Sequence, residues 1–184
     1  MRSLFFIGSM LLTMSNAYGD SLFTTKVSRP GEDILTFSDD GRSASIRVLA
    51  RNEDTGGRFS AAEHFMPAGY DGRGFHVHHG IVQAIYVVSG SVTVKLIERC
   101  KSRTITLSEG SFLSIAPEVH HTFHTEFGVK LLAIDAPGDL IPMFEAMAGI
   151  DRTQSKKQQE QELSEIRKKR YDNDFTAAIC EQDL

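Results

Sequence analysis

The sequence lacks the features that would indicate several common classes of function. Its longest apolar run, at residues 4–14, is too short for a transmembrane helix, which needs about 20 residues. The formal net charge of −4 gives no indication of a nucleic-acid partner. No glycine-rich phosphate-binding loop and no internal repeat occur. We therefore expect neither nucleic-acid binding nor stable membrane insertion.

Cysteine and tryptophan are also scarce. Cys100 and Cys180 are the only cysteines, and tryptophan is absent. After export, one disulfide joining the C-terminal tail to a loop would form from these two residues; two reduced, unpaired thiols are an equally good interpretation. The 184 residues are 41% hydrophobic and include 12 Phe, which is enough for one domain with an apolar core and some appendages.

The N-terminus has the organisation of a secretory signal peptide. Arg2 precedes the apolar residues 4–14, and the small residues Ala17 and Gly19 follow. A basic start, an apolar middle and small residues in this order are typical of an exported protein. Cleavage after Ala17 or Gly19 would fit, so we predict that residues 1–19 are removed and that the protein is secreted or periplasmic. A buried N-terminal helix or an uncleaved anchor is the alternative.

The histidines form the main functional signal. All seven lie between His64 and His124, and they fall into two groups. In the first group His76 and His78 form a His-x-His motif, and alternate side chains of an extended chain share a face, so these two imidazoles can reach one ion. The second group contains His121. Imidazole nitrogens suit Fe, Ni, Cu and Zn, and accept Mn together with oxygen ligands.

Short apolar segments separated by turn residues make up the middle of the chain. The segments with strand-like composition or two-residue alternation are 33–38, 44–50, 58–66, 82–88, 91–97, 104–107, 112–116, 121–126 and 129–136. Ser89-Gly90 predicts a tight hairpin between two of them. Many short strands at regular spacing indicate an antiparallel sandwich or barrel.

The C-terminal part is expected to be helical. Residues 139–150 predict a short helix that packs on the barrel, with Pro142 tolerated in its first turn. Residues 153–171 are polar and helix-prone, with a thin apolar stripe, so we expect a solvated helix that contacts the body weakly. The predicted organisation is a signal peptide at 1–19, a barrel with its packing helix at 20–150, and a polar C-terminal helix and tail at 151–184.

The two histidine groups resemble the two motifs of the cupin superfamily. The first cupin motif contains His-x-His, a Glu and a Gly, and here it reads His76, His78, Gln83 and Gly90. In the second motif Gly110 and His121 match, while the usual Pro, Gly and Asn are replaced by Ala116, Glu118 and Thr125. The resemblance covers about residues 60–136 and rests on two separated motifs in the same order and spacing. The chain is most similar to small cupins of the quercetin-dioxygenase-like group.

The resemblance implies an all-β fold, a double-stranded β-helix or jelly-roll barrel, here with C-terminal helices. It also implies that the two motifs lie on neighbouring strands. His76, His78 and His121, with Gln83 in the fourth place, would then hold one divalent transition metal, which is Fe, Mn, Ni, Cu or Zn. His79, His120 and His124 are interpreted as surface residues. The resemblance also implies a homodimer.

Gln83 changes the chemistry that such a site would support. Glutamine cannot act as a base and adds no negative charge. An anionic substrate would therefore suit the metal. Deprotonation would have to come from the metal's own Lewis acidity, from a bound hydroxide, or from another residue such as His64 or Glu63. We predict a metal-dependent, dioxygenase-like oxidoreductase acting on a small aromatic or enolic substrate, with Gln83 and His64 as catalytic candidates. The alternatives are a non-enzymatic cupin that binds a small ligand or a metal, and a cupin isomerase or lyase.

Overall fold

The computed structural model describes residues 25–38, 42–72, 74–138, 140–169 and 174–175. The predicted signal peptide and Cys180 lie outside these residues, so export, its cleavage site and the pairing of the cysteines stay predictions. Neither α-helix within the described ranges is long and apolar enough to cross a bilayer.

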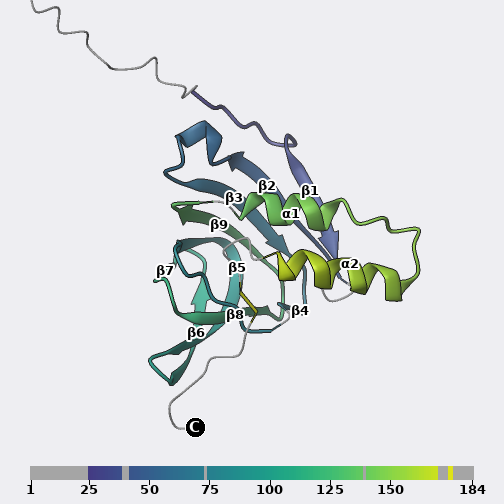
Figure 1. The fold of residues 1–184 in the computed structure, drawn as a ribbon. Coiled ribbons are helices and arrows are strands. Elements are labelled where there is room, and N and C mark those ends of the chain that lie inside the picture. Colours follow the sequence, from purple (N-terminus) through teal and green to yellow (C-terminus); the bar gives the residue numbers. More distant parts are fainter. Residues whose placement is uncertain (1–24, 39–41, 73, 139, 170–173, 176–184) are drawn as a thin grey trace, which may run out of the picture.

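The described residues form nine strands, all paired antiparallel, that curl around an apolar interior (Figure 1). The predicted all-β jelly roll with C-terminal helices is confirmed. The strands are β1 (Ile34–Ser38), β2 (Ser43–Ala50), β3 (Ser60–Met66), β4 (Tyr70–Asp71), β5 (Val82–Glu98), β6 (Lys101–Ser108), β7 (Phe112–Ile115), β8 (His120–Thr125) and β9 (Val129–Ala136).

Two sheets share the long strand β5. The first sheet has the order β1-β2-β3-β9-β5, and β7 pairs with the other edge of β5. The second sheet is built on the C-terminal half of β5, which pairs with β6 on one side and β8 on the other, and β4 pairs with β8. This arrangement brings the second histidine motif, on β8, next to the strand that follows the first motif.

The hairpin predicted at Ser89-Gly90 is wrong, because β5 continues through these residues without reversing. The pairing of β5 with β9 shifts by one residue between Val87 and Ser89, which is a β-bulge. Gly90 has a φ of 82°, so the chain bends there and passes from the first sheet into the second. The reversal comes at Arg99 and Cys100, whose φ values of 47° and 61° form the turn between β5 and β6.

Alternate side chains of the central strands fill the space between the sheets. Ile46 and Val48 on β2, Ile85 and Val87 on β5, and Leu131 on β9 are almost completely buried there. Burying one such side chain contributes about 1.5–3 kcal/mol to folding. The walls that carry the histidines are therefore held by the main core of the protein.

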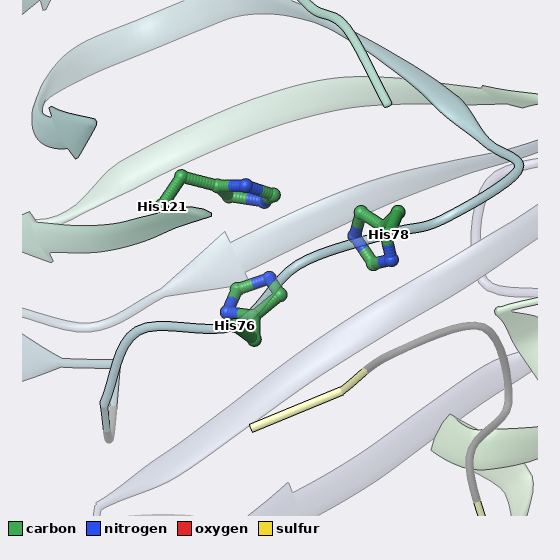
Figure 2. A group of neighbouring side chains, drawn as sticks. All are labelled: His76, His78 and His121. Carbon is green, nitrogen blue, oxygen red and sulfur yellow. The ribbon is translucent and has the colours of Figure 1, made fainter. Parts of the chain in front are cut away.

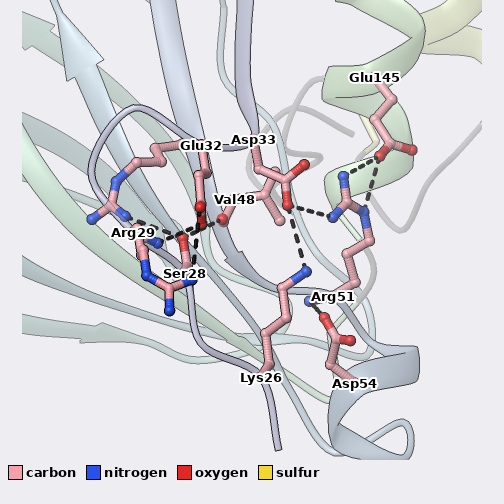
Figure 3. A network of polar contacts seen from close by, with 10 residues as sticks. Lys26, Ser28, Arg29, Glu32, Asp33, Val48, Arg51, Asp54 and Glu145 are labelled. Atoms are coloured by element: carbon pink, nitrogen blue, oxygen red, sulfur yellow. Dashed lines mark hydrogen bonds and ion pairs between the residues drawn. The ribbon is translucent and has the colours of Figure 1, made fainter. Parts of the chain in front are cut away.

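Two helices cover one side of the barrel: α1 (Ile141–Ala148) packs against β1, and α2 (Lys156–Lys168) packs against α1. Pro142 lies in the first turn of α1, as predicted. Arg51 fixes this helix to the sheet, since its guanidinium lies 3.1 Å from Asp33 and 3.1 Å from Glu145 of α1 (Figure 3). On α2, Leu163 and Ile166 are the buried residues. The helices thus form one wall above the mouth of the barrel.

Candidate metal centre

The backbone places the two histidine motifs side by side. The His76 amide donates to the His121 carbonyl at 3.0 Å, and the His121 amide donates to the His76 carbonyl at 2.8 Å. This reciprocal pair is an antiparallel bridge, in which opposed side chains lie on the same side. The ring centroids of His76 and His121 are accordingly 4.2 Å apart.

His78 completes a group of three imidazoles. It follows His76 by two residues, and its carbonyl accepts a hydrogen bond from the Glu118 amide at 2.9 Å. Its ring centroid lies 5.2 Å from that of His76 and 5.2 Å from that of His121. Figure 2 shows the three rings around a common space. One nitrogen from each ring lies within 4.8 Å of the others, and His78 and His121 are buried.

The chemistry of this group fits a divalent transition metal. His121 Nδ1 lies 2.9 Å from the Val119 carbonyl oxygen and therefore donates to it, which leaves the lone pair on Nε2. That buried Nε2 has no hydrogen-bond partner among the described residues. A backbone carbonyl that fixes the tautomer in this way is typical of metal-binding histidines. Nitrogens on one ion lie about 3–4 Å apart, so a small side-chain movement would bring all three into a coordination sphere.

Burial keeps the imidazoles of His76 and His121 neutral. It lowers the pKa of His121 to about 4, and the hydrogen bond to Val119 and the other imidazoles modify this effect. Burial, followed by repulsion from His121 and His78, holds the pKa of His76 well below its usual value. Neutral imidazole is the form that binds metal. Near pH 7 His76 and His121 therefore present lone pairs rather than positive charges.

The same pKa shifts predict that acid destabilises the metal-free protein. Unfolded histidines take up protons near pH 6.5, whereas folded His121 and His64 do so only near a pKa of about 4. Stability present above pH 6.5 is therefore lost as the pH falls toward 4, at about 1.4 kcal/mol per pH unit for each net proton. Asp135, with its pKa raised from 3.8 to about 6, opposes this trend but is outnumbered. Urea unfolding of metal-free protein near pH 7 and near pH 5 measures the effect; equal free energies of unfolding would contradict it.

Gln83 is buried next to a carboxylate that was not predicted from the sequence. Its Nε2 donates to Asp135 Oδ1 at 3.1 Å, and the two residues are directly opposite in the pairing of β5 with β9. Burial raises the pKa of the Asp135 carboxyl to about 6, although the hydrogen bond from Gln83 lowers it. The alternation of β9 contains the signal, because Asp135 follows Leu131 and Ala133 on the buried face, where a carboxylate needs a partner.

The remaining histidines lie outside the three-imidazole group. His64, on β3, lines the same cavity as His76 and packs edge-on against Phe144 of α1 at a centroid distance of 5.2 Å. Burial lowers the pKa of His64 to about 4, so it is neutral near pH 7. His79 and His124 are partly exposed; His79 lies 3.1 Å from Glu118, and His124 lies 3.7 Å from Asp71. His120 is half-buried.

A cavity of about 100 Å³ lies between the histidines and the helices. Gln83, His76 and His78 line it on one side, and α1 contributes Met143, Phe144 and Met147 on the other. No Asp or Glu lines it among the described residues, and its one formal cation there is Arg167 of α2. The volume is well below the roughly 300–1,000 Å³ of sites for drug-sized ligands. The cavity therefore suits a small molecule and offers no carboxylate as a base.

A short C-terminal segment borders the same cavity. Asp174 and Val77 exchange two backbone hydrogen bonds, of 2.8 and 2.9 Å, so this segment is bridged to the residue between the two histidines of the first motif. The Phe175 ring centroid lies 5.6 Å from that of His76, and the Arg167 guanidinium lies 5.1 Å from the Phe175 ring. Both Phe175 and Arg167 line the cavity at this edge.

Comparisons with known proteins agree with this architecture. A family model described as a cupin domain matches residues 63–135. An RmlC-like cupin from Shewanella frigidimarina NCIMB 400 is 19% identical, with a TM-score of 0.51 over 64% of this chain and 96% of that chain. A predicted oxalate decarboxylase from Thermotoga maritima is 16% identical, with a TM-score of 0.52 over 60% of this chain and 97% of that chain.

HppE, in its Fe(II) form with the alternative substrate (S)-1-HPP, is 18% identical, with a TM-score of 0.51 over 60% of each chain. At such identities the likeness concerns the fold. No curated protein matches the sequence.

Proposed function

This chain belongs to the cupin superfamily, and on that premise we propose that it is a metal-dependent oxygenase that acts on a small aromatic or enolic substrate. The imidazoles of His76, His78 and His121 carry the proposal, because one nitrogen from each lies within 4.8 Å of the others, and His76 and His78 line the cavity. HppE and the predicted oxalate decarboxylase support it as similar folds, the first of which holds Fe(II). The metal is one of Fe, Mn, Ni, Cu and Zn.

The lining of the cavity favours a small anionic substrate. Histidines, Tyr70 and Arg167 are its ionisable groups in the described part of the chain, and the rest is largely apolar. A divalent ion held by three neutral imidazoles keeps its full charge, so an enolate or carboxylate oxygen would be attracted to it. When bound, the metal would act as a Lewis acid toward a substrate oxygen. Arg167 would orient the other end of the substrate, while α1 excludes water.

The cavity contains few groups that could accept a proton from the substrate. Gln83 cannot accept a proton, and no carboxylate lines the described part of the cavity. His64 is neutral near pH 7 and lines the cavity, so we assign it as the proton acceptor. Its low pKa makes it a weak base, which favours substrates whose hydroxyl is already acidic. The signal-peptide pattern of residues 1–19 supports the further proposal that the protein acts after export, in a secreted or periplasmic form.

Oxygen consumption tests the proposed function. Protein loaded in turn with each of the five metals is mixed with small enols, one-ring phenols and flavonols, and oxygen uptake is recorded. We expect turnover by the wild type with at least one metal and a small substrate, and none by His78→Ala, because two imidazoles do not hold the ion in place.

Gln83→Glu distinguishes the oxygenase from a binding protein. If the wild type is inactive and Gln83→Glu creates oxygen uptake, the native protein is a small-ligand or metal-binding cupin. Turnover by the wild type that persists unchanged in His78→Ala would contradict the assignment of the centre.

A further inference from the structure

A row of buried polar side chains crosses three strands behind the three-histidine centre. Ser60 on β3, Asp135 on β9 and Gln83 on β5 are directly opposite one another in the two strand pairings. All three are nearly inaccessible to solvent, at 0%, 4% and 6% exposure. Only Gln83 of the three also lines the cavity. Burying a row of polar side chains inside an apolar barrel is unfavourable for folding, so we expect these residues to have a functional role.

The nitrogen and the oxygen of the Gln83 amide have different surroundings. Its Nε2 faces Asp135, at 3.1 Å from Oδ1. Its Oε1 is buried and has no hydrogen-bond partner among the described residues. The side chain lines the cavity together with His76 and His78, so the oxygen is the end available on that side. An unpartnered buried oxygen that lines the same cavity as His76 and His78 is a suitable fourth ligand, or an acceptor for a group bound to the metal.

A neighbouring carboxylate decides which end of an amide faces which way. A glutamine side chain presents an acceptor oxygen at one end and two N–H donors at the other, and it can rotate to exchange them. A carboxylate accepts hydrogen bonds, so the NH₂ group must point at it. In the opposite orientation the NH₂ group would face the imidazoles, where it cannot bind a cation. Apolar residues at position 135 would leave both orientations open.

We propose that Asp135 is a positioning residue that fixes the Gln83 amide with its oxygen toward His76, His78 and His121, and so gives the metal centre an oxygen ligand. This inference rests on the proposed metal centre but not on its reaction. It also explains how a cupin site with glutamine in place of glutamate retains an acidic group: the carboxylate lies one strand further back, on β9.

The chain packs closely around the backbone of Asp135, and only 4% of this residue is exposed to solvent. Gly138 lies against it, and a Cβ at that glycine would collide with the Asp135 carbonyl and the Ser60 amide and lie 2.7 Å from Ser60 Oγ. The close approach of residues 136–138 therefore covers this end of the row from solvent. Because Asp135 cannot turn toward water, its carboxylate keeps Gln83 as a partner.

Two variants test the proposal: Asp135→Asn alone, and the reciprocal exchange of the two side chains. Asp135→Asn keeps the shape but adds an NH₂ group that can donate to Gln83 Oε1, so the amide can turn around. We expect the affinity for Co²⁺ near pH 7.5, measured by chelator competition, to fall by roughly 10–100-fold, as is typical for loss of an outer hydrogen-bond partner. The visible absorption of the Co²⁺ protein should change as well, since it reports the coordinating atoms.

The double variant Gln83→Glu with Asp135→Asn should recover what the single variant loses. It places the carboxylate beside the imidazoles and the amide behind it, with the Asn NH₂ donating to the glutamate. We expect Co²⁺ affinity at or above that of the wild type. Recovery of this kind cannot come from misfolding. Glu63→Gln is the matched control, because it removes a carboxylate from the adjacent strand β3, where it pairs outside the cavity with Arg47 and Lys130.

Each result either supports the proposal or overturns it. Wild-type affinity and an unchanged Co²⁺ spectrum in Asp135→Asn would overturn it, as would a double variant that binds no better than the single one. An equal loss of Co²⁺ affinity in Glu63→Gln would also overturn it, because the effect would then come from the change in net charge. Failure of the metal centre itself would be distinguishable, since His78→Ala would then bind Co²⁺ as the wild type does.

Discussion

Replacing His121 by alanine should remove most of the metal from the protein. Wild-type protein purified without chelators should hold about one transition-metal ion per chain, because three convergent imidazoles suffice to bind it. The variant loses one of three imidazole ligands, so we expect its affinity to fall by more than the roughly 10–100-fold that an outer partner costs. Elemental analysis of the two proteins measures the change. His121 is buried against the Val119 carbonyl, and no other described imidazole lies where it could replace it.

His124→Ala is the matched control for this prediction. His124 lies three residues further along β8, is partly exposed and approaches Asp71 rather than the other histidines. It should keep the metal content of the wild type. Equal metal content in His121→Ala and the wild type would show that the three imidazoles do not form the binding site. Equal losses in both variants would point to a general effect of substitutions in β8.

The second large effect is expected at Gly90, where β5 passes from one sheet to the other. Its φ of 82° is in the left-handed region, which costs a residue with a side chain about 1–2 kcal/mol. A Cβ there would also collide with the carbonyl oxygen of Gly128, and overpacking of this kind adds about 1–3 kcal/mol. Gly90→Ala should therefore lower the free energy of unfolding by the sum of the two costs. Urea or thermal unfolding measures it.

Gly110→Ala separates these two costs. Gly110 has nearly the same φ, 83°, but no atom lies within 4 Å of the position that its Cβ would take. It should show the backbone cost alone, about 1–2 kcal/mol. If both variants lose the same stability, the close approach of β5 to the Gly128 carbonyl does not restrain the fold. Because the two sheets meet at Gly90, we also expect Gly90→Ala to expose more surface than the wild type at low denaturant concentrations.

The strands and the three candidate ligands could be predicted because their signals are local. Alternation places His121 and Thr125 on one face of β8, and His-x-His places His76 and His78 on one side of an extended segment. The two motifs, taken together, gave the fold through the cupin resemblance, which the family match and the similar structures confirm. The likeness to the quercetin-dioxygenase-like group stays a prediction, as do the domain limits and the homodimer.

The predicted hairpin at Ser89-Gly90 failed for a physical reason. A Ser-Gly pair between two apolar runs is compatible both with a tight turn and with a bulge in a continuous strand. The outcome depends on what lies beside the strand. Here β9 runs alongside the first half of β5, and its pairing continues past Ser89 to Gly90 opposite Val129, after which β6 and β8 take over as partners of the second half. Strand β9 is about 40 residues away in the sequence, so no local pattern distinguishes the two cases.

The amino-acid sequence by itself determined the strand periodicity, the helix starts and the two groups of histidines, since each depends on residues that are neighbours in the chain. The tertiary structure alone decided that Asp135 meets Gln83, that α1 and Arg167 border the cavity, and that His64 lies inside it while His79 lies outside. These contacts join segments tens of residues apart, and their partners are set by sheet register and by the path of the chain over the barrel. The face of a strand on which a side chain lies can be predicted from its neighbours along the strand, but the residues that pack against that face cannot.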